Sequence, residues 1–150
     1  MLSRLWDLYF EWRCRRLLEG ERPELIYSRL RKTWARADTV YRSRYGYGAI
    51  LTVEYAVLQR FLLRWRSAAV PQLRAGLDDP SAVVVAYCIV GLGMIGQPAA
   101  RSIFAGRTER LHWRLGNLVG SSTLEEFAAF SDETQVGVKW SRFSGHPGRG

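Results

Sequence analysis

Apolar residues recur at helical spacing along most of the chain, and turns rich in glycine, proline or aspartate interrupt them. The spacing predicts helices over residues 3–19, 23–42 and 49–65, followed by a helix pair within residues 68–100. Further along, the same spacing predicts a short helix over residues 99–104. A mostly helical domain is therefore expected.

The remaining third of the chain is predicted in the same way. Leucines at positions 111, 115 and 118 indicate a helix over residues 107–119. Ser122 or Thr123 is expected to cap a last helix, because hydroxyl side chains accept hydrogen bonds from free N–H groups at helix starts. Helical periodicity ends near Ser131, and residues 135–143 are expected to be extended.

The first predicted helix has one stripe at helical spacing, formed by Leu2, Leu5, Tyr9, Trp12 and Arg16 and widened by Leu8 and Phe10. Three arginines within residues 13–16 lie near its carboxyl end. Cations stabilise that end of the helix dipole, so we interpret these arginines as part of a solvated helix end.

The most apolar stretch, residues 82–95, has three possible interpretations. Gly91, Gly93 and Gly96 spell G-x-G-x-x-G, which binds a dinucleotide when it follows a strand of a parallel sheet. No second buried β-branched run follows it to complete such a sheet. Residues 81–100 carry no charge and have about the length of a membrane span, but their last six include Gly96, Gln97 and Pro98.

A buried helix explains more of this stretch. Asp79 and Pro80 suit a turn and helix start, because proline fits the first helical position and aspartate favours the positive end of the dipole. Apolar side chains at positions 84, 88, 92 and 95 share one helix face. Gly93 and Gly96 can end the helix, since glycine adopts the left-handed conformation that closes many helices.

Three short motifs mark residues 68–100: Val-Pro-x-Leu at 70–73, Leu-x-Asp-Pro at 77–80, and Leu-Gly-x-Ile-Gly-x-Pro-Ala at 92–99. Together they resemble the bacterial HEAT-like repeat family, the phycobilisome-lyase-type repeats. Val85 departs from the pattern, because the family usually has an arginine there. A weaker echo lies at residues 111–130.

The resemblance implies an all-α fold: a short α-solenoid, or HEAT-like stack of antiparallel helix pairs, with an irregular C-terminal tail. A single helical domain is expected over residues 1–143, with a HEAT-like core at about residues 49–130. Residues 144–150, rich in glycine and polar groups, are expected to be disordered.

Positive charge is concentrated in the first half of the chain. Residues 1–76 contain fifteen arginines and lysines against seven acidic residues, whereas residues 77–150 contain seven of each. This imbalance favours a polyanionic or acidic partner, although a solvated helix face also explains it. The candidate partner- or phosphate-binding residues are Arg22, Arg29, Lys32, Arg36, Arg60 and Arg64.

Side chains with catalytic or ligating chemistry are few and scattered. Cys14 and Cys88 lack metal-site spacing, and two isolated cysteines fit a reducing compartment, so a cytoplasmic location is expected. His112 and His146 have no carboxylate or cysteine at ligand spacing. We therefore expect no catalytic residue, no metal site and no cofactor. The first eighteen residues contain acidic side chains and do not form a secretory signal.

The expected function is a non-catalytic protein-interaction module, a scaffold or adaptor, whose partner is another protein with an acidic surface. Two alternatives stay open. One is a basic, helical nucleic-acid-binding protein. The other is a small subunit of a membrane complex, with residues 82–95 in or near the bilayer.

Overall fold

The computed structural model describes residues 2–43 and 52–135. Its α-helices are α1 (Leu2–Leu17), α2 (Pro23–Ala35), α3 (Val53–Trp65), α4 (Val70–Ala75), α5 (Ala82–Met94) and α6 (Leu124–Gln135). Its strands are β1 (Thr39–Tyr41), β2 (Arg110–Leu115) and β3 (Leu118–Thr123). Its 3-10 helices are η2 (Arg66–Ala69), η3 (Gly76–Asp78) and η4 (Arg101–Phe104).

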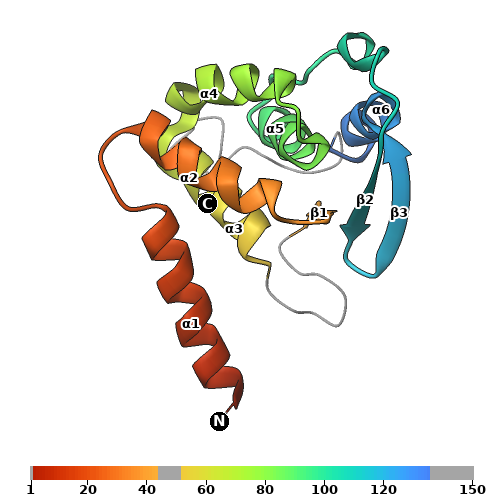
Figure 1. The fold of residues 1–150 in the computed structure, drawn as a ribbon. Coiled ribbons are helices and arrows are strands. Elements are labelled where there is room, and N and C mark those ends of the chain that lie inside the picture. The colour runs from red at the N-terminus through yellow and green to blue at the C-terminus, as the bar shows by residue number, and fades with distance from the viewer. Residues whose placement is uncertain (1, 44–51, 136–150) are drawn as a thin grey trace.

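Helix α5 is the centre of the molecule. It contacts α2, α3, α4 and α6, and it also touches β1 and β2 (Figure 1). Nearly all of its side chains are buried, from Val84 to Leu92 without interruption. The other elements therefore form a body around α5, while α1 projects from that body (Figure 1).

The prediction of an all-α, HEAT-like solenoid is wrong. The strands form a three-stranded mixed sheet in the order β1-β2-β3, with β1 parallel to β2 and β3 antiparallel to it. Thr39 is paired with His112, so the sheet joins segments that lie far apart in the chain. A stack of helix pairs is not seen in residues 2–43 and 52–135.

A β-hairpin replaces the helix predicted over residues 107–119. Gly116 and Asn117 form its two-residue turn, and Leu115 is paired with Leu118 directly across it. Gly116 has a φ of 59°, which suits the tight turns of hairpins. The leucine spacing that suggests a helix is therefore produced by two strands that fold back on each other.

Helix α2 ends earlier than predicted, at Ala35 instead of near residue 42. The chain then enters β1, where Val40 is fully buried. The N–H of Tyr41 donates a hydrogen bond of 3.0 Å to the hydroxyl of Tyr87 in α5. This bond satisfies a phenol that is buried in the core, and it fixes β1 against α5.

The start of α5, at Ala82, lies two residues later than the sequence indicates. Ser81 is the N-cap and accepts a hydrogen bond of 3.4 Å from the N–H of Val84, so Pro80 precedes the helix. Asp79 accepts a bond of 2.9 Å from the N–H of Ser81. Gly96, with a φ of 74°, follows the last turn, which confirms the predicted glycine end.

The buried position of α5 decides between the interpretations of residues 82–95. Gly91 and Gly93 lie inside the helix, not in a turn that follows a strand, so the dinucleotide motif lacks its structural context. A Cβ atom at Gly91 would lie 3.0 Å from Leu58 and 3.1 Å from Leu73, which shows how closely the neighbouring helices pack. Within the described residues, none of the helices combines the length and apolar character that a membrane span requires.

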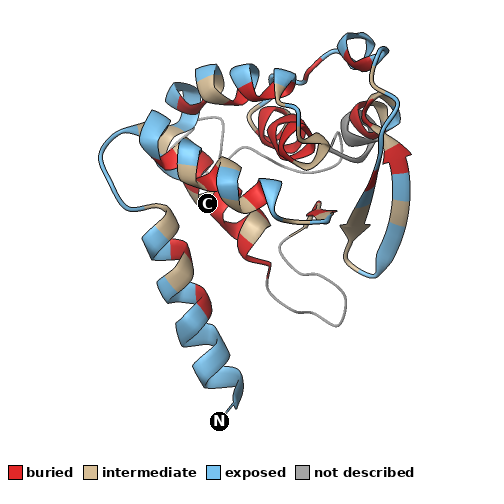
Figure 2. Cartoon of the chain, in the orientation of Figure 1, coloured by how far each residue is buried: buried red, intermediate tan, exposed pale blue. Residues whose placement is uncertain are grey.

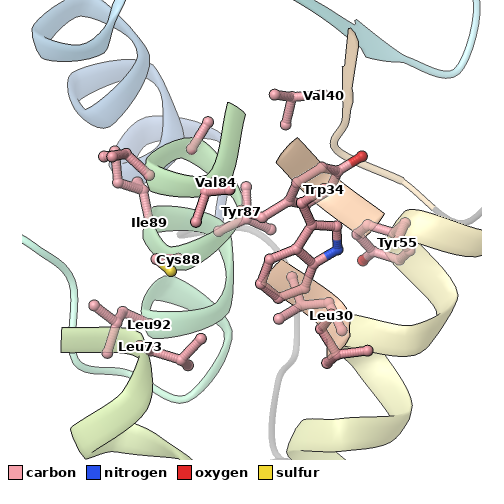
Figure 3. Packing of buried hydrophobic residues seen from close by; sticks show 14 of the residues in the cluster. Leu30, Trp34, Val40, Tyr55, Leu73, Val84, Tyr87, Cys88, Ile89 and Leu92 are labelled. Atoms are coloured by element: carbon pink, nitrogen blue, oxygen red, sulfur yellow. The ribbon is translucent and has the colours of Figure 1, made fainter. Parts of the chain in front are cut away.

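Aromatic side chains from α2 and α5 form the middle of the core (Figure 3). The rings of Trp34 and Tyr87 stack with centroids 5.2 Å apart, and Tyr27 meets Trp34 edge-on at 6.1 Å. The indole N–H of Trp34 donates to the carbonyl of Glu54 at 3.1 Å. The core is therefore packed tightly and its polar atoms are satisfied at this point.

The last described helix follows the capping prediction. Thr123 accepts a hydrogen bond of 3.3 Å from the N–H of Glu126, and the two side chains also bond to each other. Leu124 and Phe127 are buried as expected. The helix continues to Gln135, past the predicted end. The predicted extended segment beyond residue 135 and the predicted tail at 144–150 lie outside the described residues.

Candidate functional site

Helix α1 packs on the body only through its carboxyl-terminal half. Phe10 and Cys14 are its buried residues, and Leu17 is half-buried against the core. The body contacts come from α3 and α2. Residues 2–9 extend beyond the body and are exposed on every side (Figures 1 and 2).

The exposed part of α1 carries most of the large apolar side chains that the described residues leave in solvent. Their exposed fractions range from 47% to 84%. On a helical projection they cover about 160° of the circumference, so they form one continuous surface. We call this surface the apolar face; its residues are Leu2, Leu5, Trp6, Leu8, Tyr9 and Trp12.

The predicted apolar stripe of this helix therefore exists, but all of it except Phe10 faces away from the core. Phe10 and Cys14, which attach α1 to the body, lie about 140° around the helix from the centre of the apolar face. Isolated exposed leucines are normal in proteins, whereas a contiguous exposed apolar surface marks a site of association.

Three aromatic rings form a ridge along the apolar face. The ring centroids of Trp6 and Tyr9 are 5.9 Å apart, and those of Tyr9 and Trp12 are 6.0 Å apart. The guanidinium of Arg16 lies over the Trp12 ring at 5.8 Å from its centroid. The ridge therefore ends in a cation–π contact.

Charges on α1 are segregated around the helix. Asp7 and Glu11 lie on the side opposite the apolar face. Arg60 of α3 donates two hydrogen bonds to the carboxylate of Glu11, of 3.0 and 2.7 Å. This hydrogen bonding raises the pKa of Arg60. The carboxylate of Glu11 is thereby directed toward the body and away from the apolar face.

The charges that border the apolar face are all positive. Arg4 and Arg15 lie within about 40° of Leu8, along one edge. Arg13 and Arg16 lie at the carboxyl-terminal end of the face. A partner for this surface has to combine apolar groups with negative charge.

Two arginines of the body fasten the end of α1. Arg29 donates to the carbonyl of Arg16 at 2.8 Å and to that of Glu19. Arg64 donates to the carbonyls of Leu18 at 3.1 Å and Gly20 at 2.5 Å. The last carbonyls of a helix have no partners within it, and they carry the negative end of the dipole, so both guanidinium groups stabilise this end.

The six predicted binding residues therefore have different roles. Arg29, Arg60 and Arg64 gather around the base of α1 and bond to it or to the turn that follows it, which the sequence did not indicate. Arg22 pairs with Glu24 at 2.8 Å. The side chains of Lys32 and Arg36 are exposed on α2 and its cap, and they make no hydrogen bond or ion pair with the described part of the chain.

The cysteines and histidines form no reactive constellation in the described part of the chain. Burial raises the pKa of Cys88 to about 12, and burial also raises the pKa of Cys14, so both thiols are protonated at neutral pH. His112 is exposed on β2. Across residues 2–43 and 52–135, no three histidine, cysteine or acidic side chains are grouped as metal ligands.

The apolar face was missed because its residues have the spacing of an ordinary core stripe. A signal was nevertheless present. Positions 10, 14 and 17 form a second apolar series at helical spacing on the same segment. One series suffices to pack a surface helix on a core, so two series on one helix indicate a second contact partner.

The chain was also compared with known proteins. Neither the protein-family models, nor the curated proteins, nor the solved structures include a match to it. These comparisons therefore do not bear on the resemblance of residues 68–100 to the HEAT-like family.

Proposed function

We propose that this chain is a non-catalytic binding module and that α1 is its docking element. The observation that carries the proposal is the apolar face, whose six large side chains are 47% to 84% exposed. Its border of arginines selects a partner that offers an apolar surface together with acidic groups. Burial of this face would release water from large apolar side chains, which is the main driving force of association.

The remainder of the fold holds α1 in a fixed position. Arg29, Arg60 and Arg64 hold its base by charged hydrogen bonds, and Phe10 and Cys14 anchor it in the core. A helix held in its binding conformation loses less conformational entropy on association than a flexible segment does. The body therefore presents the apolar face in an orientation that is set before the partner arrives.

Binding of nucleic acid through the predicted basic residues has less support. Three of the six cations donate to carbonyl or carboxylate groups of α1 and its following turn, and Arg22 pairs with Glu24. Lys32 and Arg36 alone would make few phosphate contacts. Affinity for nucleic acid would then depend only weakly on salt, because the slope follows the number of phosphates neutralised.

The proposal is tested by affinity capture from native lysate without detergent, after nuclease treatment. The bait is the full chain, and the variant is Leu5→Ser with Tyr9→Ser. We expect the variant to retain at least about tenfold less bound material, because each large apolar side chain buried contributes about 1.5–3 kcal/mol. Circular dichroism should show an unchanged fold, since both side chains are exposed and neither is one of the buried core residues.

The matched control changes two exposed apolar residues of the body, Leu25→Ser with Ile103→Ser. These side chains are 54% and 57% exposed, much like those of the apolar face. Capture should be unchanged in the control. Equal loss in the control and in the α1 variant, or equal capture by wild type and the α1 variant, would contradict the proposal.

A further inference from the structure

The charge and shape of the apolar face also indicate which partner it fits. We infer that α1 lies in the interface of an anionic phospholipid bilayer, with its aromatic ridge among the headgroups. This inference rests on the proposed function and specifies the partner of the same surface.

The aromatic residues of the apolar face suit the interface of a bilayer. Tryptophan and tyrosine prefer the boundary between headgroups and acyl chains, because each ring has an apolar body and a polar N–H or O–H group. Trp6, Tyr9 and Trp12 follow one another along the helix at centroid distances of 5.9 and 6.0 Å. Leu5 and Leu8, both 63% exposed, flank this ridge and can reach the acyl chains.

The apolar face is wider than the stripe of a helix that binds in a protein groove. A helix that binds in a protein groove presents one stripe, at positions i, i+3 or i+4 and i+7. The apolar face covers about 160° and includes the sequence neighbours Leu5 and Trp6, and Leu8 and Tyr9. A flat fluid surface accepts so broad a sector without complementary pockets, and such sectors are typical of interfacial helices.

The distribution of charge on α1 suits an anionic lipid surface. Arg4 and Arg15 border the apolar face, and their long side chains can extend sideways to lipid phosphates while the leucines point inward. Asp7 is on the opposite side, where it would face water, and the Glu11 carboxylate is held by Arg60 of the body. The whole chain has a formal net charge of +8, so an anionic surface attracts it before contact is made.

The described body leaves the apolar face accessible to a flat surface. Phe10 and Cys14 attach α1 to the body on a side about 140° from the centre of the apolar face. Residues 2–9 also extend past the body (Figures 1 and 2). The described body therefore does not stand between the apolar face and a flat surface.

The test is cosedimentation of the full chain with phosphatidylcholine vesicles, prepared with and without phosphatidylserine. We expect binding to the anionic vesicles that is at least about twenty-five-fold stronger than to the neutral ones and that weakens as salt is raised. Leu5→Ser with Tyr9→Ser should abolish it, whereas Leu25→Ser with Ile103→Ser should leave it unchanged. Arg4→Gln with Arg15→Gln should weaken binding by about twenty-five-fold, about fivefold for each arginine.

Insertion of the ridge is measured separately with brominated lipids, which quench nearby indoles. Wild-type fluorescence should be quenched in anionic vesicles. In a variant with Trp6→Phe and Trp12→Phe, quenching should fall to background while cosedimentation persists, because phenylalanine retains the apolar surface. Unchanged quenching in this variant would place another tryptophan in the lipid and overturn the inference.

The remaining outcomes separate this inference from the proposed function. Absence of vesicle binding, equal binding to both vesicle types, or binding that survives the Leu5→Ser and Tyr9→Ser changes would overturn the membrane assignment. If the chain does not bind vesicles but capture from lysate still requires the apolar face, the partner is a protein and the docking proposal stands. If the chain does not bind vesicles and capture does not require the apolar face, the membrane assignment and the docking proposal are both wrong.

Discussion

Tyr27, Gly76 and Cys88 meet at one crowded point between α2, η3 and α5. The hydroxyl of Tyr27 lies 3.5 Å from the sulfur of Cys88. A Cβ atom at Gly76 would lie only 2.2 Å from that hydroxyl and 2.4 Å from the sulfur. This position therefore requires glycine because of space, since its backbone conformation is an ordinary one.

Replacement of Gly76 by alanine should destabilise the protein by about 1–3 kcal/mol, the usual cost of forcing extra atoms into a packed core. Alanine also restricts the unfolded chain, but that gain is at most about 1 kcal/mol and does not offset the overlap. Urea unfolding followed by circular dichroism measures the difference.

Gly106→Ala is the control, because no heavy atom lies within 4 Å of its would-be Cβ atom. Its stability should be unchanged or slightly increased. A Gly76→Ala protein as stable as the wild type would show that Tyr27 and Cys88 can move apart.

The buried position of Cys88 could be predicted from the sequence. The apolar stretch around Cys88 indicates a core position, and the structure confirms it.

At the scale of elements, the helices around the core follow from the sequence because their apolar periodicity and their end residues agree. The Asp79–Pro80 turn, the Gly96 end of α5 and the Thr123 cap of α6 are examples. The β2–β3 hairpin was missed, because Leu111, Leu115 and Leu118 have a spacing that two strands and a helix share. Periodicity alone does not distinguish them over so short a segment.

The orientation of α1 could not be predicted either. Its two apolar series both qualify as core-facing, and only the packing of Phe10 and Cys14 shows which one the body uses. The role of Arg29 and Arg64 is equally a matter of tertiary structure, because the carbonyls they bind are 10 to 46 residues away.

Loss of these two arginines should loosen α1 without unfolding the body. In a variant with Arg29→Ala and Arg64→Ala, amide hydrogen exchange within residues 2–18 should be about five- to tenfold faster, as expected if about 1–1.5 kcal/mol of local stability is lost. Exchange in α5 should not change.

Arg36→Ala is the corresponding control, since Arg36 is exposed and lies beyond the end of α2. It should leave exchange in α1 at the wild-type rate. Identical rates in the double variant and in the wild type would mean that Phe10, Cys14 and the Arg60–Glu11 pair hold the helix without these two arginines.

At the scale of the whole molecule, the turn before α5 ties together three distant parts of the chain. Arg31 of α2 donates to the carboxylate of Asp79 at 2.5 and 3.0 Å. Arg107, just before β2, donates to the carbonyls of Asp79 at 2.6 Å and Pro80 at 3.1 Å. The Asp79 side chain is only 8% exposed, whereas that of Arg31 is 38% exposed, so the carboxylate is the partner that is shielded from water.

Asp79→Ala should lower the free energy of unfolding by about 2–3 kcal/mol, because it leaves Arg31 unpaired and removes the acceptor for the Ser81 N–H group. Asp78→Ala changes the neighbouring, exposed aspartate and should cost less than about 0.5 kcal/mol. Thermal unfolding of both variants tests this difference. Similar losses in the two would contradict the proposed role of Asp79.

The global topology could not be predicted from the sequence. The motifs of residues 68–100 describe a local helix–turn–helix, and the structure contains that unit as α4, η3 and α5. The motifs do not describe how the unit continues. The parallel pairing of β1 with β2 depends on contacts between segments that no local pattern relates, so repetition of the unit was the wrong extension.

This pairing also affects how the chain folds while it is being synthesised. Thr39 is paired with His112, 73 residues later, and Val40 is paired with Trp113. When β1 leaves the ribosome, its partner strand has not yet been translated, so the sheet cannot close until most of the described chain is complete. Helices α2 to α5 can gather beforehand, because their contacts are closer in sequence. Any nascent chain that stops short of β2 therefore lacks the sheet.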